Sequence, residues 1–227
     1  MAGPFSAVML DIDGTLLDSN MAHAAAWAQV LTEFGYPTTP ERMRPLIGMG
    51  ADHVLPIVCG LHHKSPEGER IRERRSEIWK SRFEAGLQPI DGAAQAVWET
   101  MSRGVAVCIV TSANADELKG LLKRAGHKLE DLAADAVSAS PDVPSKPDPA
   151  LLLAGLEKLR LPPAQVAMLG DTEYDLQAAQ AAGVAFVGVR TGGRTDAQLQ
   201  GAAALFDTVA QALASPIFAG TTAVHAL

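Results

Sequence analysis

Short apolar runs alternate with helical patterns along most of this chain of 227 residues. Each run is rich in the aliphatic residues that buried strands favour. Strands that alternate with helices pair in parallel, and helices then cover both faces of the sheet. The sequence therefore predicts an α/β fold with a doubly wound parallel sheet. The expected strands are 7–10, 105–110, 136–137, 166–169 and 184–189.

The first two expected strands are separated by roughly ninety residues that contain helical patterns but no convincing strand. A crossover between parallel strands needs far fewer residues than this. An all-helical domain is therefore expected to be inserted into the core, with helices near 20–34, 50–58 and 65–85. The predicted division assigns residues 17–88 to the helical insert and residues 1–16 and 89–227 to the α/β core.

A pair of carboxylates follows the first expected strand in the segment DIDGTL, residues 11–16. Asp11 and Asp13 are two positions apart, and on an extended chain this spacing points both side chains the same way. Such a pair can share a divalent cation, or can divide the roles of nucleophile and general acid. Gly14 permits a sharp turn beside them. The segment favours phosphoryl transfer, and an exposed Asp-Gly turn after a buried strand is the structural alternative.

Three further motifs lie at or just after the ends of expected core segments, where open α/β sheets gather their ligands. The first is Thr111 with Ser112, whose hydroxyls and neighbouring amides can bind a phosphoryl oxygen. The alternative is that these residues only cap the following helix. The second is Lys146 in the segment KPDP, where prolines hold the lysine in a position to neutralise a phosphate. Most lysines, however, are solvated surface groups.

The third motif is GDTEYD, residues 170–175, directly after the expected strand 166–169. Asp171 is placed like a metal ligand. Thr172 and Asp175 have the form of a capping box for the next helix. Because Asp175 lies one helical turn beyond Asp171, it could also orient the ligands of a metal ion. The two roles of Asp175 are compatible with each other.

Taken together and in order, DIDGTL, a strand ending in Thr111, KPDP and GDTEYD resemble the signature of haloacid dehalogenase (HAD) superfamily phosphohydrolases. The resemblance covers essentially the whole core. The helical insert resembles the C1 cap of the subfamily that includes phosphoglycolate phosphatases and β-phosphoglucomutases. This resemblance implies a Rossmann-like core and a phosphatase that depends on Mg²⁺. Its expected substrate is a small phosphomonoester, phosphoglycolate or a sugar phosphate, hydrolysed through an aspartyl-phosphate intermediate.

The resemblance also implies a role for each matching residue. The expected catalytic residues are Asp11 as nucleophile, Asp13 as general acid and then base, and Lys146. The expected phosphate-binding residues are Thr111, Ser112 and Lys146. The expected Mg²⁺ ligands are Asp11, the backbone carbonyl of Asp13 and Asp171, with Asp175 supporting them from behind.

Several branches of the superfamily fit this chain less well. Its dehalogenases need no metal and lack the second aspartate of the pair, so Asp13 counts against haloacid chemistry. Its phosphonate-cleaving members use a cap lysine, and residues 48–63 contain none. A β-phosphoglucomutase-like phosphomutase is the enzymatic alternative, although Asp52 stands where the mutase cap carries an arginine. A phosphate-binding protein without turnover is the alternative from another class.

The insert contributes further candidate residues. The segment DSNMAHAAAW, residues 18–27, resembles the cap start of sugar-phosphate phosphatases. His23 is therefore expected to contact the substrate or Asp13, with packing within the cap as the alternative. Trp27 is expected in the cap core. The segment RPLIGMG, residues 44–50, resembles the loop that lies over the substrate, which makes Gly48 a candidate contact.

Two other groups in the insert are assigned no functional role. Four arginines interspersed with glutamates are typical of a solvated, ion-paired helix face. They are Arg70, Arg72, Arg74 and Arg75. Cys59, His62 and His63 match no strong zinc pattern.

Composition limits the partners of the protein. A formal charge of −7 and a pI near 5.3 argue against a general nucleic-acid binder, which needs a basic face. Two cysteines form no disulfide framework, and neither a leader nor a membrane span is evident, so a cytoplasmic location is expected. The expected partner is a small phosphorylated metabolite, with neither nucleic acid nor membrane. The natural substrate and the oligomeric state stay open.

Overall fold

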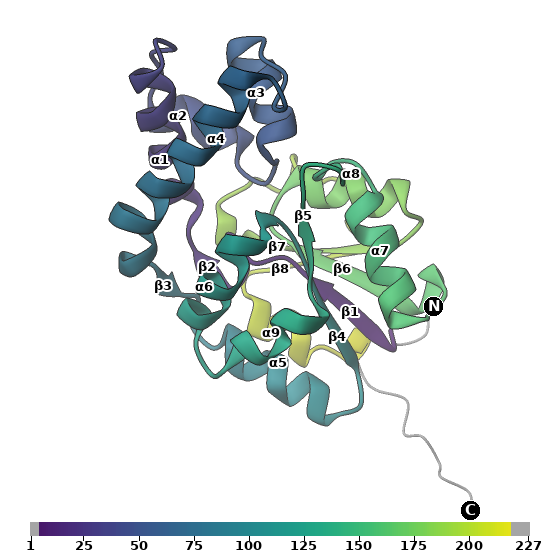
Figure 1. The fold of residues 1–227 in the computed structure, drawn as a ribbon. Coiled ribbons are helices and arrows are strands. Elements are labelled where there is room, and N and C mark those ends of the chain that lie inside the picture. Colours follow the sequence, from purple (N-terminus) through teal and green to yellow (C-terminus); the bar gives the residue numbers. More distant parts are fainter. Residues whose placement is uncertain (1–4, 219–227) are drawn as a thin grey trace, which may run out of the picture.

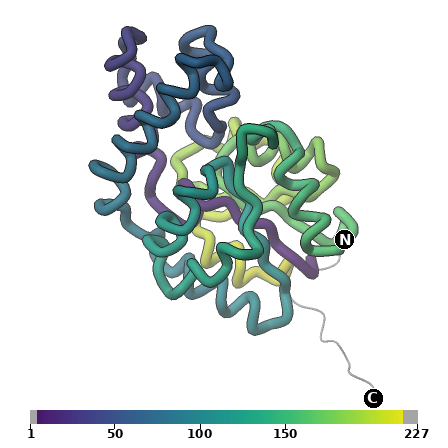
Figure 2. The backbone as a smooth tube through the Cα atoms, viewed as in Figure 1, coloured from purple at the N-terminus to yellow at the C-terminus, as the bar shows by residue number. Residues whose placement is uncertain are grey.

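The computed structural model describes residues 5–218 and has two lobes, a helical one and an α/β core (Figures 1 and 2). Six strands form one sheet in the order β5-β4-β1-β6-β7-β8, and every neighbouring pair is parallel. This confirms the predicted α/β class. The strands are β1 (Ala7–Leu10), β4 (Ala106–Asn114), β5 (Val137–Ala139), β6 (Val166–Gly170), β7 (Ala185–Val189) and β8 (Ala204–Phe206).

Strand β8 is not expected from the sequence. It has three residues, and it pairs with β7 at the edge of the sheet, where its residues are only half-buried. So short a run, without full burial, gives no pattern that separates it from a loop.

Helices cover both faces of the sheet, as a doubly wound core requires (Figure 1). One face is covered by α5 (Ala93–Ser102), α6 (Ala115–Ala125) and α9 (Val209–Ala214). The other face is covered by α7 (Ala150–Leu159) and α8 (Glu173–Ala181). Short 3-10 turns occupy Arg44–Leu46, Leu129–Asp135, Pro163–Gln165, Arg190–Gly192 and Pro216–Phe218.

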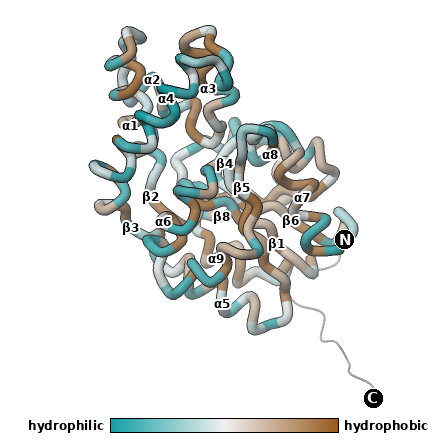
Figure 3. Tube along the Cα trace, viewed as in Figure 1, coloured by the Kyte–Doolittle hydropathy of each residue, from teal (hydrophilic) through white to brown (hydrophobic). Residues whose placement is uncertain are grey.

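The sequence of strand β1 is apolar throughout because both of its faces are buried. Successive side chains of a strand point to opposite faces of the sheet. Val8 and Leu10 belong to the apolar cluster that includes α5 and α9, whereas Ala7 and Met9 belong to the cluster that includes α7 and α8. All four are completely buried. Figure 3 shows the hydrophobic colouring concentrated in this central part of the core.

The helical lobe lies between β1 and β4 in the sequence. Its helices are α1 (Asn20–Glu33), α2 (Pro40–Met43), α3 (Ala51–Cys59) and α4 (Pro66–Ile78), followed by a π turn (Trp79–Phe83) and a 3-10 turn (Glu84–Gly86). Strands β2 (Leu17–Asp18) and β3 (Gln88–Pro89) pair antiparallel at its two ends. We propose that the segment tied off by this pair, residues 17–88, is the cap domain expected from the sequence.

Two other sequence expectations concern the end of the chain and membranes. The sequence after about Ser215 has the pattern of a short tail; the turn Pro216–Phe218 lies at its start, and its remainder lies outside the described residues. Within residues 5–218, no helix combines the length and the apolar character needed to cross a membrane.

Candidate active site

The candidate residues meet at the carboxyl ends of the central strands. Asp11 directly follows β1, Thr111 lies on β4, and Asp171 directly follows β6. Strand β1 lies between β4 and β6, so the chain changes direction along the sheet at this point. In open α/β sheets such a switch point is where ligands bind. Lys146 reaches the same point from the loop between β5 and α7.

Lys146 joins two buried carboxylates. Its Nζ lies 2.6 Å from Oδ1 of Asp11 and 2.6 Å from Oδ1 of Asp175, and it donates to the carbonyl of Val110 at 3.3 Å. These contacts use all three donors of the ammonium group. Burial alone would lower the pKa of Lys146, but Asp11 and Asp175 hold that pKa above its usual range. The sequence alternative of a solvated surface lysine is therefore wrong, because the side chain is 1% exposed.

The carboxylates outnumber this one ammonium group. Asp11, Asp171 and Asp175 each offer an oxygen, and these oxygens lie within 4.8 Å of one another. Burial raises the pKa of Asp11 well above its usual range, and Asp175 and Asp171 add to the effect that Lys146 opposes. Burial, followed by repulsion from Asp175, raises the pKa of Asp171 to about 7. With one ammonium group beside them, these buried carboxyl groups therefore cannot all ionise easily.

A metal ion fits this arrangement. Oxygen ligands suit hard divalent cations, and a second cation would offset the carboxylate repulsion. Glycines leave the space that Asp171 occupies: a Cβ on Gly14 would lie 2.3 Å from its Oδ2, and one on Gly192 would lie 1.6 Å from it. Thr15 Oγ1 and Asn20 Nδ2 donate to Asp171 at 3.2 Å and 3.0 Å. The acidic group can therefore hold a metal ion.

Asp175 has both carboxylate oxygens engaged. Oδ1 accepts from Lys146, and Oδ2 accepts from the amide of Thr172 at 3.1 Å and its hydroxyl at 2.7 Å. The reciprocal bond from the amide of Asp175 to Thr172 completes the capping box at the start of α8. Both oxygens of Asp175 are therefore already engaged, and its support of the metal ligands stays a prediction.

The side chain of Asp13 contacts residues at the start of the helical lobe. Its Oδ1 accepts from Ser19 Oγ at 2.5 Å and lies 2.8 Å from His23 Nε2. Burial would raise the pKa of Asp13, but its contact with His23, the hydrogen bond from Ser19 and the charge of Arg75 lower it. Asp13 is therefore a carboxylate at neutral pH in this structure. That its backbone carbonyl binds a metal stays a prediction.

Behind His23, a chain of contacts runs from the cap to the core. Arg75 Nη2 donates to His23 Nδ1, which places the ring proton on Nε2, facing Asp13. Arg75 Nη1 also lies 2.6 Å from Glu117 Oε1 on α6. The His23 ring stacks on Trp79 at 3.8 Å between centroids. His23 is thus both packed and in contact with Asp13, so the two sequence alternatives for it are both realised.

The two hydroxyl residues near the end of β4, Thr111 and Ser112, make different contacts. Thr111 Oγ1 accepts from the amide of Ala113 at 3.0 Å, within its own turn. The helix α6 is capped by Asn114, whose side chain accepts from the amide of Glu117 at 3.0 Å, so capping does not require the pair. Ser112 lines the active-site cavity, and its buried hydroxyl has no hydrogen-bond partner among the described residues. Ser112 is therefore free to bind a ligand oxygen.

The cap closes over this cavity. Gly48 lines it with a φ of +112°, and a Cβ there would lie 2.9 Å from the ring of Tyr174. The hydroxyl of Tyr174 donates to the carbonyl of Pro45 at 2.7 Å, and Arg194 donates to the same carbonyl at 2.9 Å. The cavity is partly open and measures about 130 Å³, small beside the sites of drug-sized ligands. Its size favours a small organic group.

The expectation of a solvated arginine face on α4 is confirmed for Arg74 and wrong for two others. Arg74 is half-exposed and pairs with Glu33 and Glu77. Arg75 is only 8% exposed, and Arg72 lines the active-site cavity. The sequence does contain a signal for Arg75, since it lies four residues after Ile71 and three before Ile78, on the buried stripe of the helix.

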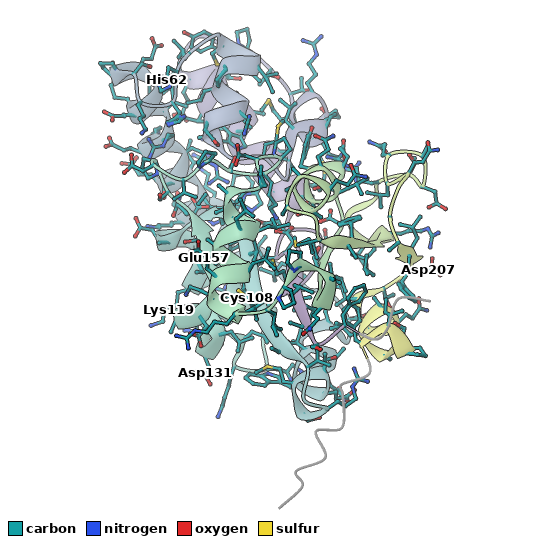
Figure 4. All side chains as sticks on the ribbon, turned by 90° about the vertical axis from the view of Figure 1, so that its right-hand side faces the viewer. His62, Cys108, Lys119, Asp131, Glu157 and Asp207 are labelled. Carbon is teal, nitrogen blue, oxygen red and sulfur yellow. The ribbon has the colours of Figure 1, made fainter. Side chains whose placement is uncertain are left out.

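Other contacts of the site have no signal in the sequence. Ser19, Asn20, Thr15 and Ser145 are small polar residues, and only the folded chain brings them to the carboxylates or to the cap. Trp27 is buried as expected, and it also lines the cavity. Figure 4 shows His62 in the cap, at the far end from the core, and Cys108 inside the core; Cys59 and Cys108 are both free.

A family model described as haloacid dehalogenase-like hydrolase matches residues 8–189, which include Lys146 and the aspartates of the site. The chain belongs to this family. It is 30% identical over 184 residues to a phosphoglycolate phosphatase of Aliivibrio fischeri, a match that covers 78% of this chain and 80% of that protein. The resemblance inferred from the motifs, and with it a hydrolase enzyme, is confirmed.

Other similarities agree with this membership. The chain is 28% identical over 189 residues to an N-acetylmuramic acid 6-phosphate phosphatase of Pseudomonas aeruginosa, with 82% of each chain covered. It is 31% identical over 193 residues to the chloroplastic protein SUPPRESSOR OF QUENCHING 1 of Arabidopsis thaliana, where the match covers 83% of this chain but only 18% of that protein. A solved hydrolase from Pseudomonas syringae superposes with a TM-score of 0.82 at 26% identity, covering 91% of this chain and 94% of that one.

The buried pair of Arg75 and Glu117 predicts a stability difference. Replacing Glu117→Ala leaves the guanidinium buried without its carboxylate, so we expect the free energy of unfolding to fall by about 3–5 kcal/mol. The measurement is urea denaturation. Arg74→Ala removes an exposed ion pair from the same helix, and it should change stability only slightly. If the two variants lower the free energy of unfolding equally, the buried ion pair does not stabilise the contact between cap and core.

Proposed function

We propose that this protein is a Mg²⁺-dependent phosphatase of small phosphomonoesters, of the phosphoglycolate or sugar-phosphate class. The observation that carries the proposal is the contact of Lys146 with Asp11 and Asp175 beside a third buried carboxylate. Asp11, Asp13 and Ser112 line one small cavity next to this group. The phosphatases among its relatives support the same chemistry.

The substrate phosphate would enter between Asp11 and Ser112. Lys146 offsets the repulsion between the attacking carboxylate and the phosphate oxygens, because its charge is fixed and its position is held by buried contacts. Ser112 offers an unused hydroxyl, and the amides at the start of α6 add further donors. Thr111 supports this turn. When bound by Asp11, Asp171 and the Asp13 carbonyl, Mg²⁺ supplies additional neutralisation of charge.

Chemistry then proceeds in two displacements at phosphorus. A carboxylate oxygen of Asp11 forms a bond to phosphorus while the bond to the ester oxygen breaks, and Asp13 donates a proton to that leaving oxygen. The alcohol departs and leaves an aspartyl-phosphate. Asp13 next takes a proton from water, whose oxygen attacks phosphorus and releases phosphate. Asp11 regains its carboxylate.

The contacts of Asp13 suit this exchange of roles. His23 and Ser19 hold its carboxylate toward the cavity and keep it ionised before substrate binds. An arriving phosphate adds negative charge nearby, and like charges raise the pKa of a carboxyl group. Asp13 would therefore bind a proton when substrate is present and release it toward the leaving oxygen. His23 and Ser19 are positioning residues for this step.

Cap contacts would protect the intermediate from premature reaction. The loop with Gly48 lies against Tyr174, and Asp52 accepts from the amide and hydroxyl of Ser145, next to Lys146. A closed cap excludes bulk water and strengthens the electrostatic interactions inside. Because Asp52 is an acidic residue engaged with Ser145, it supplies no cation at the position where the mutase cap carries one. We therefore favour hydrolysis over phosphomutase chemistry and over binding without turnover.

The location of the protein is also part of the proposal. Cys59 and Cys108 are free thiols, and burial raises the pKa of each to about 11. A cytoplasmic, reducing environment suits them.

The proposed nucleophile can be tested directly. Asp11→Asn should lower phosphate release from phosphoglycolate and sugar phosphates by roughly a thousandfold or more, because an amide cannot accept the phosphoryl group. The measurement is colorimetric detection of phosphate with Mg²⁺ and with a chelator. Asp131→Asn makes the same change at an exposed position of the α/β core and should keep full activity. Full activity of Asp11→Asn would refute the role.

The metal site predicts a thermal shift. Adding Mg²⁺ to chelator-treated protein should raise the melting temperature, because a ligand that binds only the folded state stabilises it. Asp171→Asn should abolish this shift, and Asp131→Asn should retain it. Since the pKa of Asp171 is raised to about 7, protons compete with the cation below that pH, and the shift should be smaller at about pH 6 than at about pH 8. An undiminished shift in Asp171→Asn would place the metal elsewhere.

A further inference from the structure

Arg72 stands out among the arginines of α4 because it lines the active-site cavity without a carboxylate partner. Within residues 5–218, no carboxylate oxygen lies within 4.0 Å of its guanidinium, and its hydrogen bond there goes to the carbonyl of His63 at 3.4 Å. The other arginines of this helix all have partners. Arg70 lies over the ring of Phe34, Arg74 pairs with Glu33 and Glu77, and Arg75 pairs with Glu117.

The neighbours of Arg72 in the cavity leave its charge uncompensated. Besides Asp11 and Asp13, two carboxylates line the cavity, and both are already engaged. Glu117 is bound by Arg75, and both oxygens of Asp52 accept hydrogen bonds from Ser145. His63 also lines the cavity, and its buried Nε2 has no hydrogen-bond partner among the described residues. Unused polar groups therefore gather at the cap end.

A guanidinium in this setting favours an anion. It keeps its charge at every physiological pH and carries five donors, of which one weak bond uses a single N–H. Its planar array matches a carboxylate or a phosphate, and such charge-assisted bonds are about twice as strong as neutral ones. Asp11, which Lys146 contacts, lines the core wall of the same cavity, and Arg72 belongs to the cap wall. A substrate that spans the cavity would thus meet Asp11 with its partner Lys146 at one end and Arg72 at the other.

We propose, building on the phosphatase function above, that Arg72 binds a second anionic group on the part of the substrate that leaves. The substrate class is then a small phosphomonoester whose organic group carries a carboxylate or a second phosphate. His63 adds a polar contact beside the guanidinium. Arg72 determines specificity, whereas Asp11 and Asp13 act on the phosphate.

The test compares substrates of matched size that differ in one charged group. Phosphoglycolate is paired with ethylene glycol monophosphate, and propanediol bisphosphate with propanediol monophosphate. We expect wild type to prefer the charged member of at least one pair in kcat/KM. Arg72→Gln should reduce that preference by about tenfold or more, as expected for loss of a charge-assisted contact. The pair that responds identifies the anion as carboxylate or phosphate.

Arg70→Gln is the matched control, because Arg70 lies on the same helix over Phe34 and outside the active-site cavity. It should keep the wild-type preference, and Arg72→Lys should restore part of it. A preference that is the same in wild type and Arg72→Gln for both pairs would overturn the proposal. So would the absence of any preference for a charged member in wild type.

Binding measurements separate this proposal from the phosphatase function itself. Calorimetry with phosphoglycolate and propanediol bisphosphate on the Asp11→Asn protein needs no turnover. The double variant Asp11→Asn/Arg72→Gln is compared with Asp11→Asn alone. Weaker binding of either compound to the double variant supports the anion site, even if the wild-type protein proves to have no phosphatase activity. Unchanged binding of both compounds overturns the anion site, even if phosphatase activity is present.

Discussion

The bridge of Lys146 between Asp11 and Asp175 is the interaction on which the rest of the site depends. It joins three chain segments, which follow β1, β5 and β6, at one point of the sheet. Removing the ammonium would leave buried carboxylates that repel one another, and uncompensated buried charges cost several kcal/mol. Burial, followed by repulsion from Asp175, raises the pKa of Asp171, so its ionised form gains from a cation at the same point, where a phosphate can then bind.

Much of this core follows from the sequence. The run before Asp11 is apolar at every position because both faces of β1 are covered, and that pattern predicts a parallel sheet. Residues that follow parallel strands meet at one edge of the sheet, so the sequence alone is enough to place the carboxylates near one another. The capping box of Thr172 and Asp175 is also predictable, because it depends on neighbours in the sequence.

The cap is harder to predict for a physical reason. Alternating arginines and glutamates have the same pattern on a solvated face as on a face that closes over a cavity, and tertiary contacts decide between the two. Arg75 is buried because Glu117, from a distant helix, compensates its charge. Arg72 faces the cavity without such compensation among the described residues. The small residues Ser19 and Ser145 gain their importance only from the partners that folding supplies.

The central claim is that Asp11 accepts the phosphoryl group. The most direct measurement is to quench the enzyme with acid during turnover of phosphoglycolate or a sugar phosphate and to locate the added phosphoryl group by peptide mass spectrometry. We predict a phosphoryl group on Asp11 that is absent from Asp11→Asn. A phosphoryl group on another side chain, or one that persists in Asp11→Asn, would contradict the account.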